Sequence, residues 1–145
     1  MTDTKELRER REQTVRAHVD AENRQDVDGI VESFSATNAA YDIPAFGDAG
    51  QRSGPEEIRE LWVGLLAAFP DIHHDILRLR HGDDHVLVEF TVTGTQKADW
   101  AGIPAAGRTF AVRVAAIYEF DGEDMVCERT YTDLAEMVSQ LRGEG

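Results

Sequence analysis

The sequence predicts an α+β protein in which helices come first and a meander of long strands follows. Helical spacing of apolar residues dominates the first half of the 145-residue chain, and alternation of apolar and polar residues dominates the second half. Glycine-bearing turns separate the later strands, which is typical of antiparallel pairing. Because helices and strands are segregated, we expect an antiparallel sheet covered by helices, within a single domain spanning residues 1–145.

Three helices are expected before the sheet. Residues 4–25 form a long amphipathic helix, and its apolar spacing places His18 on the inward face. Asp26 has a side chain suited to cap a second, short helix. A third helix begins at Pro55 and carries a continuous apolar stripe that includes Trp62, a candidate core residue. All three helices therefore have an apolar face to bury against the sheet.

The strands follow from alternation and from the turns between them. We expect strands at residues 38–44, 72–80, 85–97, 108–120 and 125–132. Residues 46–54 contain several glycines and are expected to form a loop, so that Asp42 stands at a strand end facing it. A last short helix is expected at residues 134–141.

Alternation also predicts which side chains face the helices. The even positions from 86 to 92 are apolar and include Phe90. The even positions from 110 to 120 are apolar as well and include Ala116 and Tyr118. Because side chains on a strand point alternately to opposite faces, these two rows are expected to line the interior.

The inward row of the last strand is expected to be the odd one. Glu128 suits solvent better than the core, which leaves Arg129 and Tyr131 pointing inward. A buried arginine needs an acceptor, because an unpaired charge in the interior costs several kcal/mol. Asp42 and Asp133 are the candidate acceptors.

Composition excludes several classes of partner. The formal net charge of −13 makes nucleic acid and anionic membranes poor partners. No apolar run approaches the length of about 20 residues that spans a bilayer, and the charged N-terminus does not resemble a secretion signal. Cys127, the only cysteine, cannot form an internal disulfide and is expected to be buried. We expect a cytoplasmic protein.

Three stretches carry a family resemblance: FPDIHHDI at the start of the sheet, GTQKADWAGIPAAGRTF in a hairpin and RTYTDLAEMVSQL at the end. Together with the order of elements, they resemble the SnoaL-like polyketide cyclases. These belong to the superfamily of nuclear transport factor two, which includes ketosteroid isomerase. The resemblance implies a cone-shaped, bent antiparallel sheet wrapped around the N-terminal helices, as in the cystatin-like roll. It also implies a homodimer formed through the outer face of the sheet.

The resemblance implies a reaction type as well. SnoaL-like cyclases close a ring by an intramolecular aldol reaction without metal or cofactor. They use a carboxylate base on the last long strand and a histidine on the strand before it. Counting back from DGEDMV places the histidine position near Ala116 and the carboxylate position on or near Thr130, which leaves Asp133 as the nearest acid.

The stretches QDVDGIVESF, YDIP and GPEEIRELW resemble ketosteroid isomerase, and this likeness implies other roles. In that register Asp42 matches the general base, His18 falls where the isomerase has its oxyanion-holding tyrosine, and Ala116 replaces a protonated aspartic acid. An enolate needs a stabilising partner, often the largest single contribution to catalysis. His18, Tyr131 or Tyr118 is expected to supply it.

The limonene epoxide hydrolases of the same superfamily offer a further comparison. They need two aspartates and an arginine, with arginine and aspartate two residues apart on one strand. Ala115 follows Arg113 at that spacing, so the motif is absent there. Arg129, Asp133 and Asp42 could form a similar set of one arginine and two aspartates from different positions in the chain.

Side chains of metal-binding type gather around one predicted hairpin: His73, His74, His81, Asp83 and His85. Adjacent residues on a strand face opposite ways, so this cluster does not predict a metal site.

The sequence thus favours a cofactor-free enzyme that acts on a small hydrophobic carbonyl compound. Asp42 or Asp133 would remove a proton α to the carbonyl, and His18, Tyr131 or Arg129 would stabilise the oxyanion. The side chains expected to contact substrate are Arg129, Tyr131, Tyr118, Trp62, Trp100 and Phe90, with Trp100 in a hairpin tip that covers the mouth of the cone. The alternative is a non-catalytic binding or sensor protein of the same fold.

Overall fold

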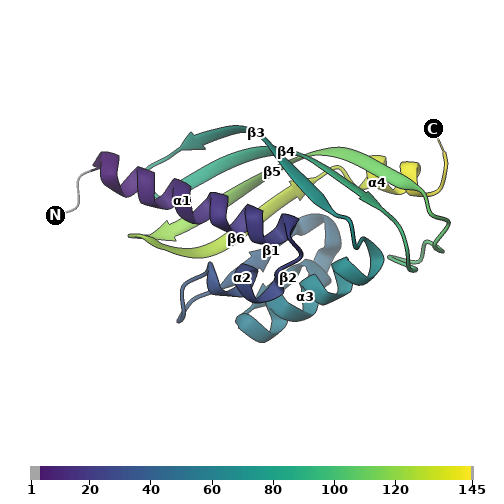
Figure 1. Ribbon diagram of the computed structural model, residues 1–145, viewed down its shortest axis with the longest axis horizontal. Coiled ribbons are helices and arrows are strands. Elements are labelled where there is room, and N and C mark those ends of the chain that lie inside the picture. Colours follow the sequence, from purple (N-terminus) through teal and green to yellow (C-terminus); the bar gives the residue numbers. More distant parts are fainter. Residues whose placement is uncertain (1–3, 145) are drawn as a thin grey trace.

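The computed structural model describes residues 4–144, which fold as helices packed against one curled sheet (Figure 1). The helical elements are α1 (Thr4–Asn23), α2 (Val27–Glu32), the 3-10 segment η1 (Pro44–Gly50), α3 (Pro55–Ala68) and α4 (Leu134–Leu141). The strands are β1 (Ala40–Asp42), β2 (Gln51–Ser53), β3 (His73–His81), β4 (His85–Thr95), β5 (Thr109–Asp121) and β6 (Asp124–Thr132). They are ordered β2-β1-β6-β5-β4-β3. The predicted α+β class is confirmed.

The first helices form as their sequences predict. The long helix α1 lies across the sheet (Figure 1) and packs against β3, β4 and β6. His18 is on its buried face. Asp26 caps α2, because its carboxylate accepts a hydrogen bond of 3.0 Å from the backbone N–H of Gly29. Within residues 4–144, no helix is both long and apolar enough to cross a membrane.

The segment between α2 and α3 differs from the prediction. The expected strand at residues 38–44 shortens to β1, and the expected loop at residues 46–54 contains η1 and the short strand β2. β1 also pairs parallel to β6, whereas an entirely antiparallel sheet was expected. The chain passes through α3, β3, β4 and β5 before it returns, and a connection this long permits a parallel pair.

The inward rows of the two central strands are as predicted. The even positions of β4 and β5 are buried and include Phe90, Ala116 and Tyr118. These side chains pack in one core with those of α1 and α3, such as Val15 and Ile58. The concave side of the sheet therefore forms the wall of the interior.

A β-bulge interrupts the pairing between β5 and β6. Phe120 lies opposite Met125, but the residue before it on β5, Glu119, lies opposite Cys127. Val126 consequently has no partner on β5. An extra residue of this kind shifts the alternation of every side chain that follows it on the bulged strand.

The bulge corrects the predicted orientation of β6. Beyond it, Glu128 lies opposite the buried Tyr118 and Thr130 lies opposite Ala116, so both face the interior. Arg129 and Tyr131 point to the outer face instead, and Tyr131 is 50% exposed. The prediction that Arg129 and Tyr131 face inward is therefore wrong, because a strict two-residue period was assumed where the strand carries one extra residue.

Candidate functional site

A mostly apolar pocket opens between α3 and the concave face of the sheet. Its volume accessible to water is about 80 Å³. Polar groups enter its lining from four elements: Glu22 of α1, Tyr41 of β1, His74 of β3, and Glu128 and Thr130 of β6. Apolar pockets with a few convergent polar groups are the usual form of small-molecule sites.

His18 lies behind this polar end and joins its two carboxylates. Its ring is fully buried, and Nε2 lies 2.8 Å from Glu128 Oε1 and 3.4 Å from Glu22 Oε2. Glu22 follows His18 by one helical turn, which brings both side chains to the same face of α1. The cluster of His18, Glu22 and Glu128 is therefore held by a helix and a strand far apart in the sequence.

Ser33 determines the orientation of the His18 ring. Its hydroxyl donates its only hydrogen to the carbonyl of Ile30 at 2.6 Å, so the hydroxyl oxygen must accept from His18 Nδ1 at 2.6 Å. Nδ1 of His18 is thus protonated. Nε2 is left to face the carboxylates.

The carboxylates keep His18 charged. Burial alone disfavours the imidazolium, but the charge of Glu22 and the hydrogen bond to Glu128 outweigh it and raise the pKa of His18 to about 10. Burial likewise opposes ionisation of Glu22, yet the His18 charge lowers the pKa of that carboxyl. At neutral pH the site therefore contains an imidazolium and an ionised Glu22.

Two tyrosines remain phenols in this environment. Tyr41 donates to Glu22 Oε2 at 3.2 Å, and its oxygen lies 2.9 Å from His18 Nε2. Burial, followed by the negative charges of Glu128 and Glu22, raises the pKa of Tyr41 and the pKa of Tyr118 well above their usual value. Neither ring is a source of negative charge at physiological pH.

Two polar atoms beside the pocket have no hydrogen-bond partner among the described residues. They are Nε1 of Trp62 and Nδ1 of His74, and both side chains contribute to the pocket lining. Trp62 is only 3% exposed. A buried donor without a partner is costly, so an acceptor on a bound molecule would stabilise it.

Aromatic rings form the outer wall of the pocket. Phe46 of η1 packs edge-on against Trp100 at a centroid distance of 5.5 Å, and Trp100 packs against Phe69 at 5.3 Å. Phe46 also lines an adjacent open groove together with Trp100 and Leu61. Trp100 therefore packs behind two rings of the pocket lining and is not itself part of that lining.

The structure places most of the predicted catalytic residues elsewhere. Asp42 accepts a hydrogen bond of 3.0 Å from Arg129 Nε, and Arg129 also pairs with Glu119. All three lie on the outer face of the sheet, away from the pocket lining. Arg129 and Asp42 do come together, but Asp133 does not join them. Asp133 caps α4 instead, accepting 3.0 Å from the N–H of Glu136.

The predicted interior residues divide into lining and support. Trp62 lines the pocket. Tyr118 and Phe90 are buried beside it without lining it: Tyr118 packs against the His18 ring at 5.6 Å, and Phe90 against the His74 ring at 5.7 Å. His18 is in the interior as predicted, behind the two carboxylates and outside the pocket lining.

Sequence reasoning missed Glu22, Tyr41 and Glu128. The pair His18 and Glu22, four residues apart on the inward face of one helix, was a readable signal. Glu128 was missed because the bulge reverses its expected orientation, and Tyr41 was missed because β1, the strand that carries it, has only three residues. Their convergence depends on tertiary packing.

The same cluster is the place where a metal ion would find ligands. One donor atom from each of His18, Glu22 and Glu128 lies within 4.8 Å of the others, and no second group of this kind occurs in the described part of the chain. Without a metal, these ligand atoms already pair with one another, because His18 Nε2 faces the oxygens of Glu22 and Glu128. The predicted hairpin histidines do not gather; His73 pairs with Asp75, and His85 with Asp84.

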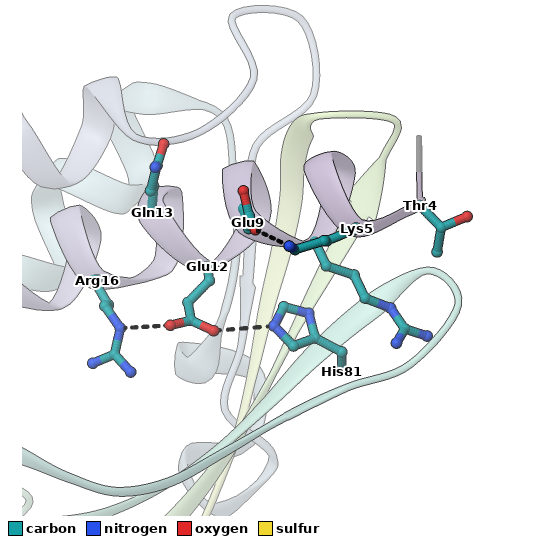
Figure 2. Close-up of a pocket in the computed structure, with 8 residues that line it drawn as sticks. Thr4, Lys5, Glu9, Glu12, Gln13, Arg16 and His81 are labelled. Atoms are coloured by element: carbon teal, nitrogen blue, oxygen red, sulfur yellow. Dashed lines mark hydrogen bonds and ion pairs between the residues drawn. The ribbon is translucent and has the colours of Figure 1, made fainter. Parts of the chain in front are cut away.

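A second hollow lies on the surface along the start of α1 (Figure 2). There Glu12 accepts from Arg16 and pairs with His81, each at 3.1 Å, and Lys5 lies 4.0 Å from Glu9. Exposed ion pairs of this kind contribute little free energy. The surface hollow lacks the apolar walls of the inner pocket, which is therefore the candidate site.

The curled sheet with its covering helices is the fold of solved proteins described as nuclear transport factor two-like or ketosteroid isomerase-like. Three solved structures share this fold. A candidate SnoaL-like polyketide cyclase from Jannaschia sp. CCS1 is 17% identical with a TM-score of 0.84, covering 98% of each chain. A protein of ketosteroid isomerase-like fold from Catenulispora acidiphila, in complex with trimethylamine, is 24% identical with a TM-score of 0.75, covering 88% of this chain and 90% of that one. IdmH, a candidate polyketide cyclase from Streptomyces antibioticus, is 23% identical with a TM-score of 0.75, covering 90% and 97%.

The sequence profile of the SnoaL-like polyketide cyclases matches residues 12–141. The chain belongs to this family. A comparison with curated protein sequences gives no significant match. The family predicted from the three sequence motifs is thus confirmed.

Proposed function

We propose that the protein is a cyclase-type enzyme that removes a proton α to the carbonyl of a small molecule, without a cofactor. The observation that carries this proposal is the buried cluster of His18, Glu22 and Glu128 at the polar end of an apolar pocket. Membership of the polyketide cyclase family supports the reaction type. Carboxylates in apolar surroundings are the usual bases for such proton transfers.

Glu22 is the proposed base. Glu128 is committed on both oxygens, since Oε1 faces His18 at 2.8 Å and Oε2 accepts from Thr130 at 2.6 Å. The hydrogen bonds of Glu22 within residues 4–144 end on Oε2, which leaves Oε1 available at the pocket. Glu128 then acts as a positioning residue, because it holds His18 charged beside the base.

Trp62 is the proposed oxyanion donor. When Glu22 takes the α proton, the C–H electron pair moves into the enolate and negative charge develops on the carbonyl oxygen. The buried Nε1–H of Trp62 has no partner within the described protein and lines the same pocket. A donor that is already free needs no rearrangement at the moment of reaction. The enolate then attacks a second carbonyl to close a ring, or is reprotonated as in an isomerisation.

A binding or sensor protein is the second candidate function. Ala116 on β5 supports it, because this buried methyl group stands where the related enzymes are expected to carry a proton-transfer group. An epoxide hydrolase-like reaction has less support. Its arginine and aspartate, Arg129 and Asp42, lie on the outer face of the sheet.

Exchange of α protons for deuterium distinguishes an enzyme from a binding protein. We expect the wild type to accelerate exchange at the α carbon of small ketones, cyclohexanone first, in D2O followed by NMR. Glu22→Gln should slow this exchange by about 100-fold or more, the usual loss for a general base. Glu57→Gln, at an exposed position of α3, is the matched control and should leave the rate unchanged.

Two results would count against this proposal. If ketones bind to the wild type but exchange protons no faster than in buffer, the enzyme proposal is rejected in favour of a binding protein. Equal rates for the wild type and Glu22→Gln would remove Glu22 from the role of base.

A further inference from the structure

The polar end of the pocket holds more negative than positive groups. Glu22 and Glu128 both line it, and each forms an ion pair with the same residue, His18. Two carboxylates and one imidazolium leave one negative charge, even with His18 fully protonated. His74 also lines the pocket, and Nδ1 of its ring has no hydrogen-bond partner among the described residues.

The described part of the pocket lining offers no permanently charged cation to offset this charge. None of the described residues that line the pocket is an arginine or a lysine. Arg129 is next to Glu128 in the chain, but it points to the outer face and pairs there with Asp42 and Glu119. An uncompensated buried charge is costly, so a positive group on a ligand would be stabilised here.

The walls around this end are suited to an alkylated cation. Tyr41, Trp62, Phe46 and Phe69 contribute aromatic rings to the lining, and the rings of Tyr41 and Trp62 lie 6.4 Å apart. Aromatic faces attract ammonium groups through their quadrupole, most strongly where water is excluded. The unpartnered Nε1–H of Trp62 adds a donor that needs an oxygen acceptor.

From these features we infer that the pocket takes a small cationic ligand, with a protonated or quaternary ammonium group beside Glu22 and Glu128 and an oxygen acceptor for Trp62. The inference deepens the proposed function of the same pocket and rests on it for the carbonyl: together they define the substrate class as small amino-carbonyl compounds. The ammonium group offsets the charge of the cluster, and the oxygen satisfies the indole N–H.

A matched pair of probes tests the inference without catalysis. Choline carries a quaternary ammonium and a hydroxyl, and dimethylbutanol is its neutral analogue, in which carbon replaces the nitrogen. We expect isothermal titration calorimetry at pH 8 and low salt to show choline binding to the wild type about tenfold or more tightly than dimethylbutanol. This ratio corresponds to about 1.4 kcal/mol, within the range of desolvated cation–aromatic contacts.

The variants identify which charge is responsible. Glu22→Gln should bring the affinity ratio close to one while dimethylbutanol binding is retained, and Glu128→Gln should reduce the ratio in the same direction. Glu57→Gln removes one exposed charge of the same sign and should keep the full preference. Thermal unfolding of each variant verifies that the protein is folded.

Three outcomes would overturn the inference: equal binding of the two probes, a preference that survives both pocket variants, or no saturable binding of choline to the wild type. The proposed reaction fails on different grounds. Selective choline binding together with absent proton exchange would retain the cationic ligand and reject the catalytic role.

Discussion

Replacing His18 with alanine should lower the free energy of unfolding by about 3–5 kcal/mol. The substitution removes the cation that two buried carboxylates share, while Glu22 and Glu128 stay 1% and 5% exposed. It also leaves a cavity behind a ring that is fully buried. Urea unfolding of wild type and variant, followed by far-UV circular dichroism, measures the difference.

A double-mutant cycle separates the charge effect from the cavity. Glu128→Gln alone, His18→Ala alone and both together give the coupling free energy between the two side chains. We expect a coupling of about 1–3 kcal/mol, because the second change costs less once the charged partner is gone. Strictly additive losses would show that His18 stabilises the fold through volume alone.

Raising the pH should destabilise the protein through His18. Its pKa is about 10 in the folded chain and 6.5 in its reference state. A raised pKa gives stability that is fully present below the unfolded value and is lost as the pH rises through the folded one. Between these values the folded state holds a proton that the unfolded state has released. The free energy of unfolding should therefore fall between pH 7 and pH 10, by up to about 4 kcal/mol at 1.36 kcal/mol per pH unit.

The control for this pH dependence is a protein without the ring. His18→Gln should unfold with a much shallower dependence on pH over the same interval, although it starts from a lower stability. Tyrosine and lysine side chains titrate in both proteins, so the difference between the two curves isolates His18. Parallel curves would mean that His18 is not charged in the native state.

Much of the fold follows from local pattern. α4 begins and ends as the sequence predicts, and α1 stops two residues early, where Gln25 takes a positive φ of 57°. Where apolar residues recur with a clear period of 3.6 or 2, the sequence predicts which side chains are buried, as the inward rows of β4 and β5 show. The short strands β1 and β2 were missed in part because three residues are too few to establish a period.

The site was less predictable than the fold, for a physical reason. Asp42 and Arg129 were expected to meet, and they do, but on the face opposite to the pocket. Two residues can be neighbours on either side of a sheet, and sequence parity alone decides the side only where the ladder is regular. The buried position of His18 was predictable because it lies on a helix, where neighbouring apolar residues identify the buried face.

The unpaired Val126 bears on how this chain should be aligned with its relatives. Counting residues from the hairpin assigns Thr130 to the carboxylate position, whereas Glu128, opposite Tyr118, is the acid that reaches the pocket. A bulge absorbs an inserted residue, so the residues beyond it keep their cross-strand partners although their count along the chain changes by one. Equivalent positions on β6 are therefore better assigned by their cross-strand neighbours on β5 than by distance along the chain. Loss of Val126 should shorten the strand yet keep the same acid facing inward.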